Sequence, residues 1–94
     1  MQGSFNFTTI GILNARRNGI EPGEVWDLLG SDNRVIISVG DTSRLYLGTT
    51  GQGRNLAVLV AEDPDEDDVW DVVAARDTTA TEDAAMDRLR RRFP

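Results

Sequence analysis

The apolar positions of this 94-residue chain change their spacing along its length, and each change predicts a new element. Phe5 and Phe7 alternate around one polar residue, which indicates a short first strand. Helical spacing follows over residues 9–18, with Ile12 and Ala15 on one face, and Gly19 is typical of the residue that ends a helix.

A second helix is predicted to begin at Pro22, because proline is favoured in the first helical turn, and to end at Gly30. We expect its buried stripe to consist of Val25, Trp26 and Leu29.

Beyond this helix the pattern is typical of strands, since short runs rich in β-branched residues alternate with turn residues. The expected strands cover residues 34–39, 43–50, 54–62 and 69–75. Gly51 and Gly53 indicate a hairpin turn, and the acidic residues 63–68 indicate a solvated turn. The last two strands are apolar on both faces, which predicts central positions in a sheet.

A third helix is predicted at the C-terminus. Thr79 and Glu82 have the spacing of a capping box, in which the two side chains each bind a free backbone N–H. Its buried residues are expected to be Met86, Leu89 and Phe93. The order β-α-α-β-β-β-β-α and the short connections favour one α+β domain over residues 1–94, with a small antiparallel sheet of four to five strands, two N-terminal helices and one C-terminal helix.

Composition narrows the chemistry available to such a domain. The chain has no cysteine and no histidine, which removes disulfides, thiolate chemistry, the commonest metal ligand and the usual general base. All ten basic residues are arginines, which suit carboxylate or phosphate. The net charge of -6 comes from residues 61–94, which carry five arginines against eleven acids. We expect no metal and no cofactor.

The expected cellular location follows from two patterns that the sequence lacks, an export signal and a membrane-spanning segment. The N-terminus lacks basic residues before its apolar part, and no apolar run approaches about 18 residues. We therefore expect no export signal, no membrane span and a cytoplasmic protein.

Three local patterns are better explained by structure than by chemistry. The acidic run 63–68 fails the EF-hand pattern because Asp68 stands where glycine is needed, so a solvated turn is favoured over a weak cation site or partner surface. The glycines in 48–54 do not open a helix, as a phosphate-binding loop must. Trp26 and Trp70 are expected in the core rather than as base-stacking platforms, since basic residues flank neither.

Arginines carry the strongest candidate chemistry. Each arginine alone is typical of a solvated or ion-paired surface residue, but several arginines close together could bind a phosphodiester. Cleavage of RNA through its 2′-hydroxyl needs orientation and cations on the developing oxyanion. The candidates are Arg16, Arg17, Arg44, Arg54 and Arg76, and the residues that could accept a proton are Glu82, Asp77 and Tyr46.

The spacing of these motifs resembles that of the BrnT-type toxins, RelE-like small ribonucleases of bacterial toxin–antitoxin pairs, along nearly the whole chain. The end of the family's first helix matches at Asn14, Arg17, Gly19 and Ile20. Its Arg-x-x-x-Gly strand and hairpin return match at Arg44, Gly48, Gly53, Arg54 and Leu56. Its C-terminal motif matches residues 73–86, with Arg76, Thr79 and Glu82 in place.

The resemblance implies a RelE-like fold and a metal-independent endoribonuclease. Arg44 and Arg76 would be its catalytic cations, helped by Glu82. RNA would be bound by Arg16, Arg17, Arg54 and Tyr46. The implied partner is a small antitoxin protein, and either a heteromeric complex or a homodimer would fit.

Four departures from the family pattern support a second hypothesis. Asn18 replaces the family's histidine, Asp77 its lysine, Asp83 its arginine and Met86 its tyrosine. Two cations thus become acids, and an acid beside a phosphate weakens its binding. Under this hypothesis the chain is a catalytically degenerate member of the fold that acts as a protein-interaction module.

Overall fold

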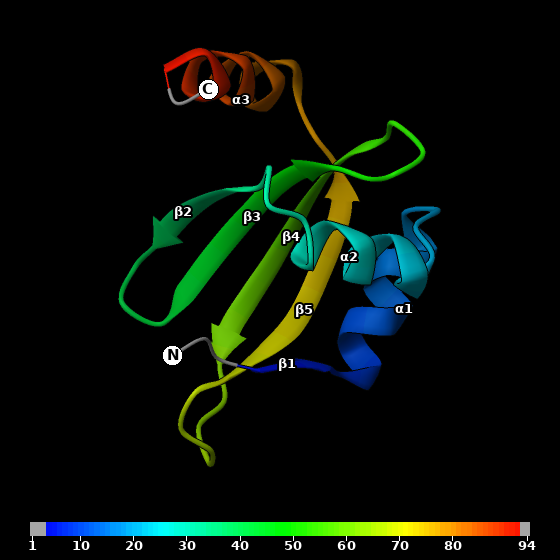
Figure 1. Ribbon diagram of the computed structural model, residues 1–94. Helices are drawn as coiled ribbons and strands as arrows, with labels where there is room; N and C mark the ends of the chain where they lie inside the picture. Colours follow the sequence, from blue (N-terminus) through cyan, green and yellow to red (C-terminus); the bar gives the residue numbers. More distant parts are fainter. Residues whose placement is uncertain (1–3, 93–94) are drawn as a thin grey trace.

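The computed structural model of the protein describes residues 4–92, so Phe93, predicted to be buried, lies outside the described residues. The elements are β1 (Ser4–Phe7), α1 (Thr9–Arg17), α2 (Pro22–Leu29), β2 (Val35–Val39), β3 (Ser43–Thr49), β4 (Asn55–Glu62), β5 (Val69–Asp77) and α3 (Ala80–Arg92). The predicted α+β class and element order are confirmed (Figure 1).

The five strands form one sheet in the order β1-β5-β4-β3-β2. The predicted central positions of β4 and β5 are confirmed, because each has a neighbour on both sides. The pairs from β2 to β5 are antiparallel, as expected for strands joined by short turns, whereas β1 runs parallel to β5. No hairpin constrains β1, which leads through Thr8 into α1, the helix that packs on β5.

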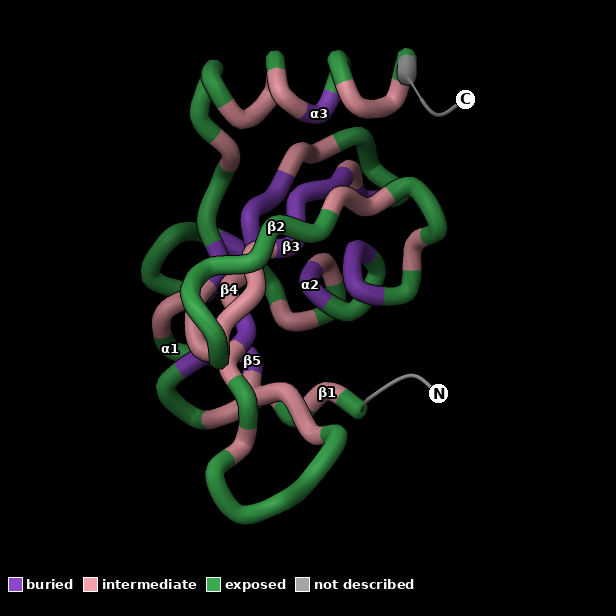
Figure 2. The backbone as a smooth tube through the Cα atoms, turned by 90° about the vertical axis from the view of Figure 1, so that its left-hand side faces the viewer, coloured by how far each residue is buried: buried purple, intermediate pink, exposed green. Residues whose placement is uncertain are grey.

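Helices cover the two faces of the sheet unequally. The larger core lies under α1 and α2, where Val25, Leu28 and Tyr46 are buried with residues of β4 and β5. The smaller core lies on the other face, where Met86 of α3 packs on Leu47 and Ala57. Figure 2 shows the buried backbone in β3, β4 and β5 and the exposed backbone of β2. None of the described helices is long and apolar enough to cross a membrane.

The prediction that Trp26 belongs to the buried stripe of α2 is wrong. The buried residues are Val25, Leu28 and Leu29, while Trp26 is 44% exposed. Trp26 lies about one quarter of a turn away from that stripe. It packs edge-on against Phe7 instead, with ring centroids 5.8 Å apart.

The fifth strand is longer than predicted. Arg76 pairs with Ala57 and Asp77 pairs with Leu56, so β5 continues two residues beyond the expected end at residue 75. The sequence turns polar there, but β4 still offers backbone partners. Arg76 is therefore held in a strand rather than in the loop that follows it.

Candidate functional site

Arg44 and Arg76 lie on opposite faces of the sheet. Arg76 is opposite Ala57, and Ala57 is opposite Leu47. Arg44 lies three residues before Leu47, and side chains alternate between faces along a strand, so Arg44 points to the other side. Strand rise and spacing put the two Cα atoms about 14 Å apart. The structure therefore does not bring the two predicted catalytic arginines to one phosphate.

Arg76 is bound to Glu82. Its two terminal nitrogens donate to the two carboxylate oxygens of Glu82 at 2.7 and 2.9 Å, and Nη1 also donates to the carbonyl of Asp77 at 3.1 Å. A bidentate pair of this kind is stronger than a neutral hydrogen bond. A phosphate approaching Arg76 would compete with this carboxylate for the positive charge.

Glu82 also completes the predicted capping box of α3. The backbone N–H of Thr79 donates to Glu82 Oε1 at 2.9 Å, and the backbone N–H of Glu82 donates to Thr79 Oγ1 at 3.2 Å. Arg76, and then the Thr79 backbone, lower the pKa of Glu82 from 4.5 to about 2. A general base needs a pKa near the working pH, so this carboxylate is a poor proton acceptor.

Arg54 is likewise engaged with acids. Its Nε and Nη2 donate to Asp77 at 2.8 and 3.2 Å, and its Nη1 lies 3.4 Å from Glu24 in α2. The bond to Asp77 raises the pKa of Arg54, and the same bond lowers the pKa of Asp77. Nη1 also donates to the carbonyl of Gly19 at 2.9 Å. Arg54 thus ties α2 and the α1–α2 turn to the end of β5.

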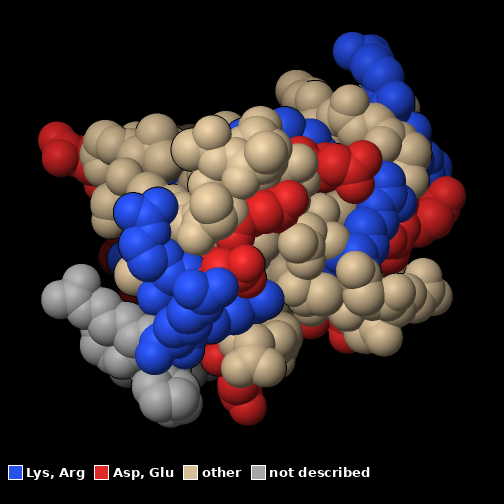
Figure 3. Space-filling view, turned by 90° about the horizontal axis from the view of Figure 1, so that it is seen from above, with Lys and Arg blue, Asp and Glu red and all other residues tan. Residues whose placement is uncertain are grey.

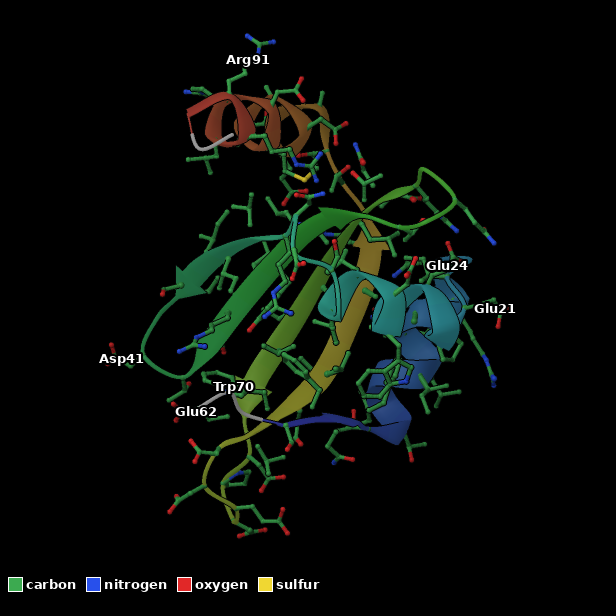
Figure 4. The ribbon with its side chains drawn as sticks, viewed as in Figure 1. Glu21, Glu24, Asp41, Glu62, Trp70 and Arg91 are labelled. Atoms are coloured by element: carbon green, nitrogen blue, oxygen red, sulfur yellow. The ribbon has the colours of Figure 1, made fainter. Side chains whose placement is uncertain are left out.

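Arg44 and Tyr46 belong to the face covered by α1 and α2. The Arg44 guanidinium lies 4.3 Å from the centroid of the Trp70 ring. Trp70 is half-buried, at the end of the sheet away from α3 (Figure 4). Tyr46 is 3% exposed and packs edge-on against Phe5, with centroids 5.6 Å apart. Tyr46, predicted to bind RNA, is therefore a core residue.

Two asparagines of α1 lie against β5. Asn14 Oδ1 accepts a hydrogen bond from the Ala75 N–H at 3.1 Å, and Asn18 Nδ2 donates to the Ala75 carbonyl at 2.9 Å. Arg16 and Arg17 are exposed on the last turn of the same helix, where cations suit the helix dipole. Asn18, which the resemblance aligns with a histidine of BrnT-type toxins, therefore has a structural partner in this fold.

A groove of about 320 Å³ lies on the face of the sheet that α3 only partly covers. Its floor is apolar, and Arg76 and the two amides of α1 stand at its rim. The lining residues are Asn14, Asn18, Val39, Leu45, Ala57, Leu59, Ala74, Ala75 and Arg76. Sequence reasoning missed this groove, although Leu45, Leu59 and Ala74 are all apolar positions of neighbouring strands, paired across the sheet.

Charge is spread unevenly around this face. Figure 3 shows arginine side chains in separate groups on opposite sides of the upper surface, with acidic side chains between and beside them. The arginines at the C-terminal end of α3 include Arg88, Arg90 and Arg91. Within residues 4–92, acidic side chains form no group of three or more arranged to hold a metal ion.

Comparison of the chain with models of known protein families found no match, and neither did comparison with curated proteins. The likeness to BrnT-type toxins therefore rests on the motifs of the chain itself.

Proposed function

We propose that this chain is a catalytically degenerate, BrnT-like domain that binds a small partner protein. The observation that carries the proposal is the bidentate pair between Arg76 and Glu82. It occupies the cation that the resemblance would place at the reacting phosphate, and it lowers the pKa of the expected base. Arg44, the second expected cation, lies on the other face of the sheet.

The surroundings of Arg76 suit protein better than RNA. The groove beside it has an apolar floor formed by residues such as Leu45, Leu59 and Ala74. Covering an apolar surface with an apolar partner is favourable, because both surfaces are removed from water. The phosphates of RNA instead need unpaired cations. The net charge of -6 further disfavours nonspecific binding to RNA. We infer that an apolar segment of the partner lies in this groove, with a polar group near Asn14 and Asn18.

A nuclease assay separates this proposal from the ribonuclease hypothesis. The purified chain, Arg76→Ala and the matched control Arg88→Ala, at an exposed arginine of α3, are each incubated with single-stranded RNA in the presence of a chelator. We expect intact RNA in all three reactions. Cleavage by the wild type and by Arg88→Ala, but not by Arg76→Ala, would overturn the proposal and establish the nuclease.

A binding assay tests the groove directly. The BrnT-like resemblance implies that a small gene beside this one encodes the partner. The product of such a gene is the probe, so the two proteins are produced together and their complex is isolated through a tag on one. We expect a complex that Leu59→Lys abolishes, because the charge would enter the apolar floor. Leu13→Lys, an equal change at a position 56% exposed on α1, is expected to leave the complex intact.

A further inference from the structure

Among residues 4–92, no strand pairs with the outer edge of β2. Strand β2 pairs with β3 on one side, and its other side faces outward at the end of the sheet. Figure 2 looks onto this edge, where the β2 backbone is exposed. Three apolar side chains of the strand are well exposed: Ile36 at 46%, Ile37 at 39% and Val39 at 46%.

Strand β2 lacks the charged residues, the proline and the bulges by which proteins usually protect free strands. Edge strands are blunted by charged residues, proline, bulges or a covering element, because unpaired N–H and C=O groups recruit other strands. The five residues Val35–Val39 include no charge and no proline, and their pairing with β3 has an unbroken register. The strand at the opposite edge of the sheet is β1, and beyond its end the amides of Asn14 and Asn18 bind the backbone of β5.

We propose that β2 pairs with β2 of a second copy, antiparallel across a two-fold axis, so that the two sheets form one continuous sheet of ten strands. Such a pair is closed and uses the same surface on both copies. Pairing about Ile37 places Val35 of each copy opposite Val39 of the other. One face of the junction is then an uninterrupted apolar row that continues to Leu45 and Leu47.

Charge along the strand direction favours the antiparallel arrangement. The turn after β2 carries Asp41 and adjoins Glu62, whose N–H donates to the carbonyl of Thr42 at 2.8 Å. The acidic residues 63–68 follow at this same end of the sheet. Figure 4 shows Asp41 at the outer end of the β2–β3 turn, far from Arg91 on α3.

The start of β2 lies at the arginine-rich end. Arg90 Nη2 donates to the carbonyl of Asn33 at 3.1 Å, so the C-terminal half of α3 lies beside the residues that lead into β2. Arg88 and Arg91 are exposed on the same part of the helix. Antiparallel pairing therefore brings the acidic turn of each copy towards the arginines of the other, which is electrostatic complementarity for a second copy of this chain.

The molar mass in solution tests the dimer. Sedimentation equilibrium over a range of concentrations is expected to show a species of twice the 10.4 kDa chain mass, dissociating on dilution and more readily at high salt. Ile37→Lys should give a monomer, because two lysines would face each other near the two-fold axis. Leu13→Lys, the matched change on α1, should remain a dimer. Circular dichroism confirms that each variant is folded.

A cross-linking experiment gives a second, independent readout. Because the chain has no cysteine, a single introduced thiol can pair only with its copy. Ile37→Cys, the position on the proposed two-fold axis, should form a disulfide-linked dimer on oxidation, whereas Gln52→Cys in the β3–β4 turn should not. A wild-type monomer at every concentration, or a dimer indifferent to Ile37→Lys, would overturn the proposal.

Discussion

The side chain of Asn14 takes the place of a neighbouring strand beside Ala75. Strand β1 pairs with β5 only from Val69 to Val72, so the outward backbone groups of Ala75 have no strand partner on that side. Asn14 accepts from the Ala75 N–H, Asn18 donates to the Ala75 carbonyl, and the two amides bind each other at 3.3 Å. Helix α1 thereby extends the pairing of β5 beyond the end of β1.

Asn14→Leu should destabilise the fold. Leucine has a similar size but no acceptor, and it would leave the N–H of the fully buried Ala75 unpaired, which costs about 1–3 kcal/mol. Urea unfolding measures the loss, and hydrogen exchange at the Ala75 amide should accelerate. Leu13→Ala at the adjacent, exposed position serves as the control. Equal stability of Asn14→Leu and wild type would show that water replaces the amide.

The packing of α1 on β5 also depends on Gly11. A Cβ atom at this position would lie 2.0 Å from the carbonyl oxygen of Val72, which is backbone and cannot move aside cheaply. Gly11→Ala should therefore destabilise the protein by about 1–3 kcal/mol, although alanine favours helices. Gly23→Ala in α2 is the matched control, because a Cβ there meets no atom within 4 Å.

The two glycine variants should change stability in opposite directions. In the open environment of Gly23, alanine should stabilise the fold by about 0.5–1 kcal/mol through helix propensity alone. Thermal unfolding of both variants and the wild type gives the comparison. If Gly11→Ala were as stable as the wild type or more stable, α1 could not lie as close to Val72 as it does in the structure.

Much of the fold follows from local sequence signals. The boundaries of α1, α2 and β4 were predictable to within about one residue, because Gly19, Pro22 and the turn glycines have strong conformational preferences. The reciprocal bonds between Thr79 and Glu82 confirm the predicted capping box. The parallel pairing of β1 with β5 joins residues about two thirds of the chain apart, and no local signal encodes it.

The candidate site was less predictable because it depends on register. The registers of β3 with β4 and of β4 with β5 decide whether Arg44 and Arg76 lie on the same face of the sheet. A shift of one residue in either register would move one arginine to the other face. The C-terminal motif contains Arg76 and Glu82 at a spacing that allows their ion pair, but sequence alone also allowed Arg76 to be free. The role of Asn18 was hidden because its partner is a backbone group far along the chain.

Because of Glu82, the free energy of unfolding should decrease at low pH. Its pKa of about 2 lies below its ordinary value of 4.5, so ionised Glu82 stabilises the fold at neutral pH. This contribution is complete above about pH 4.5 and is lost as the pH falls towards 2. Because Arg76 is 46% exposed, solvent screening reduces the contribution to about 1–2 kcal/mol.

Glu82→Gln isolates that contribution. The variant should be less stable than the wild type by about 1–2 kcal/mol at pH 7, and the two should converge near pH 2, where Glu82 becomes protonated. Urea unfolding across this pH range gives the difference. Asp87→Asn, an exposed carboxylate on the same helix, is expected to show neither effect. A constant difference between Glu82→Gln and wild type at all pH values would exclude the ion pair as its cause.

Arg44 should contribute to stability and not to partner binding. Its guanidinium lies over Trp70 on the face opposite the groove, and a cation above an aromatic ring contributes about 0.5–2 kcal/mol. Arg44→Ala should lower the free energy of unfolding by that amount and shift the tryptophan emission, while the complex with the small partner keeps its affinity. Arg16→Ala controls for loss of one positive charge. Weaker partner binding by Arg44→Ala at full stability would instead extend the binding surface to this second face of the sheet.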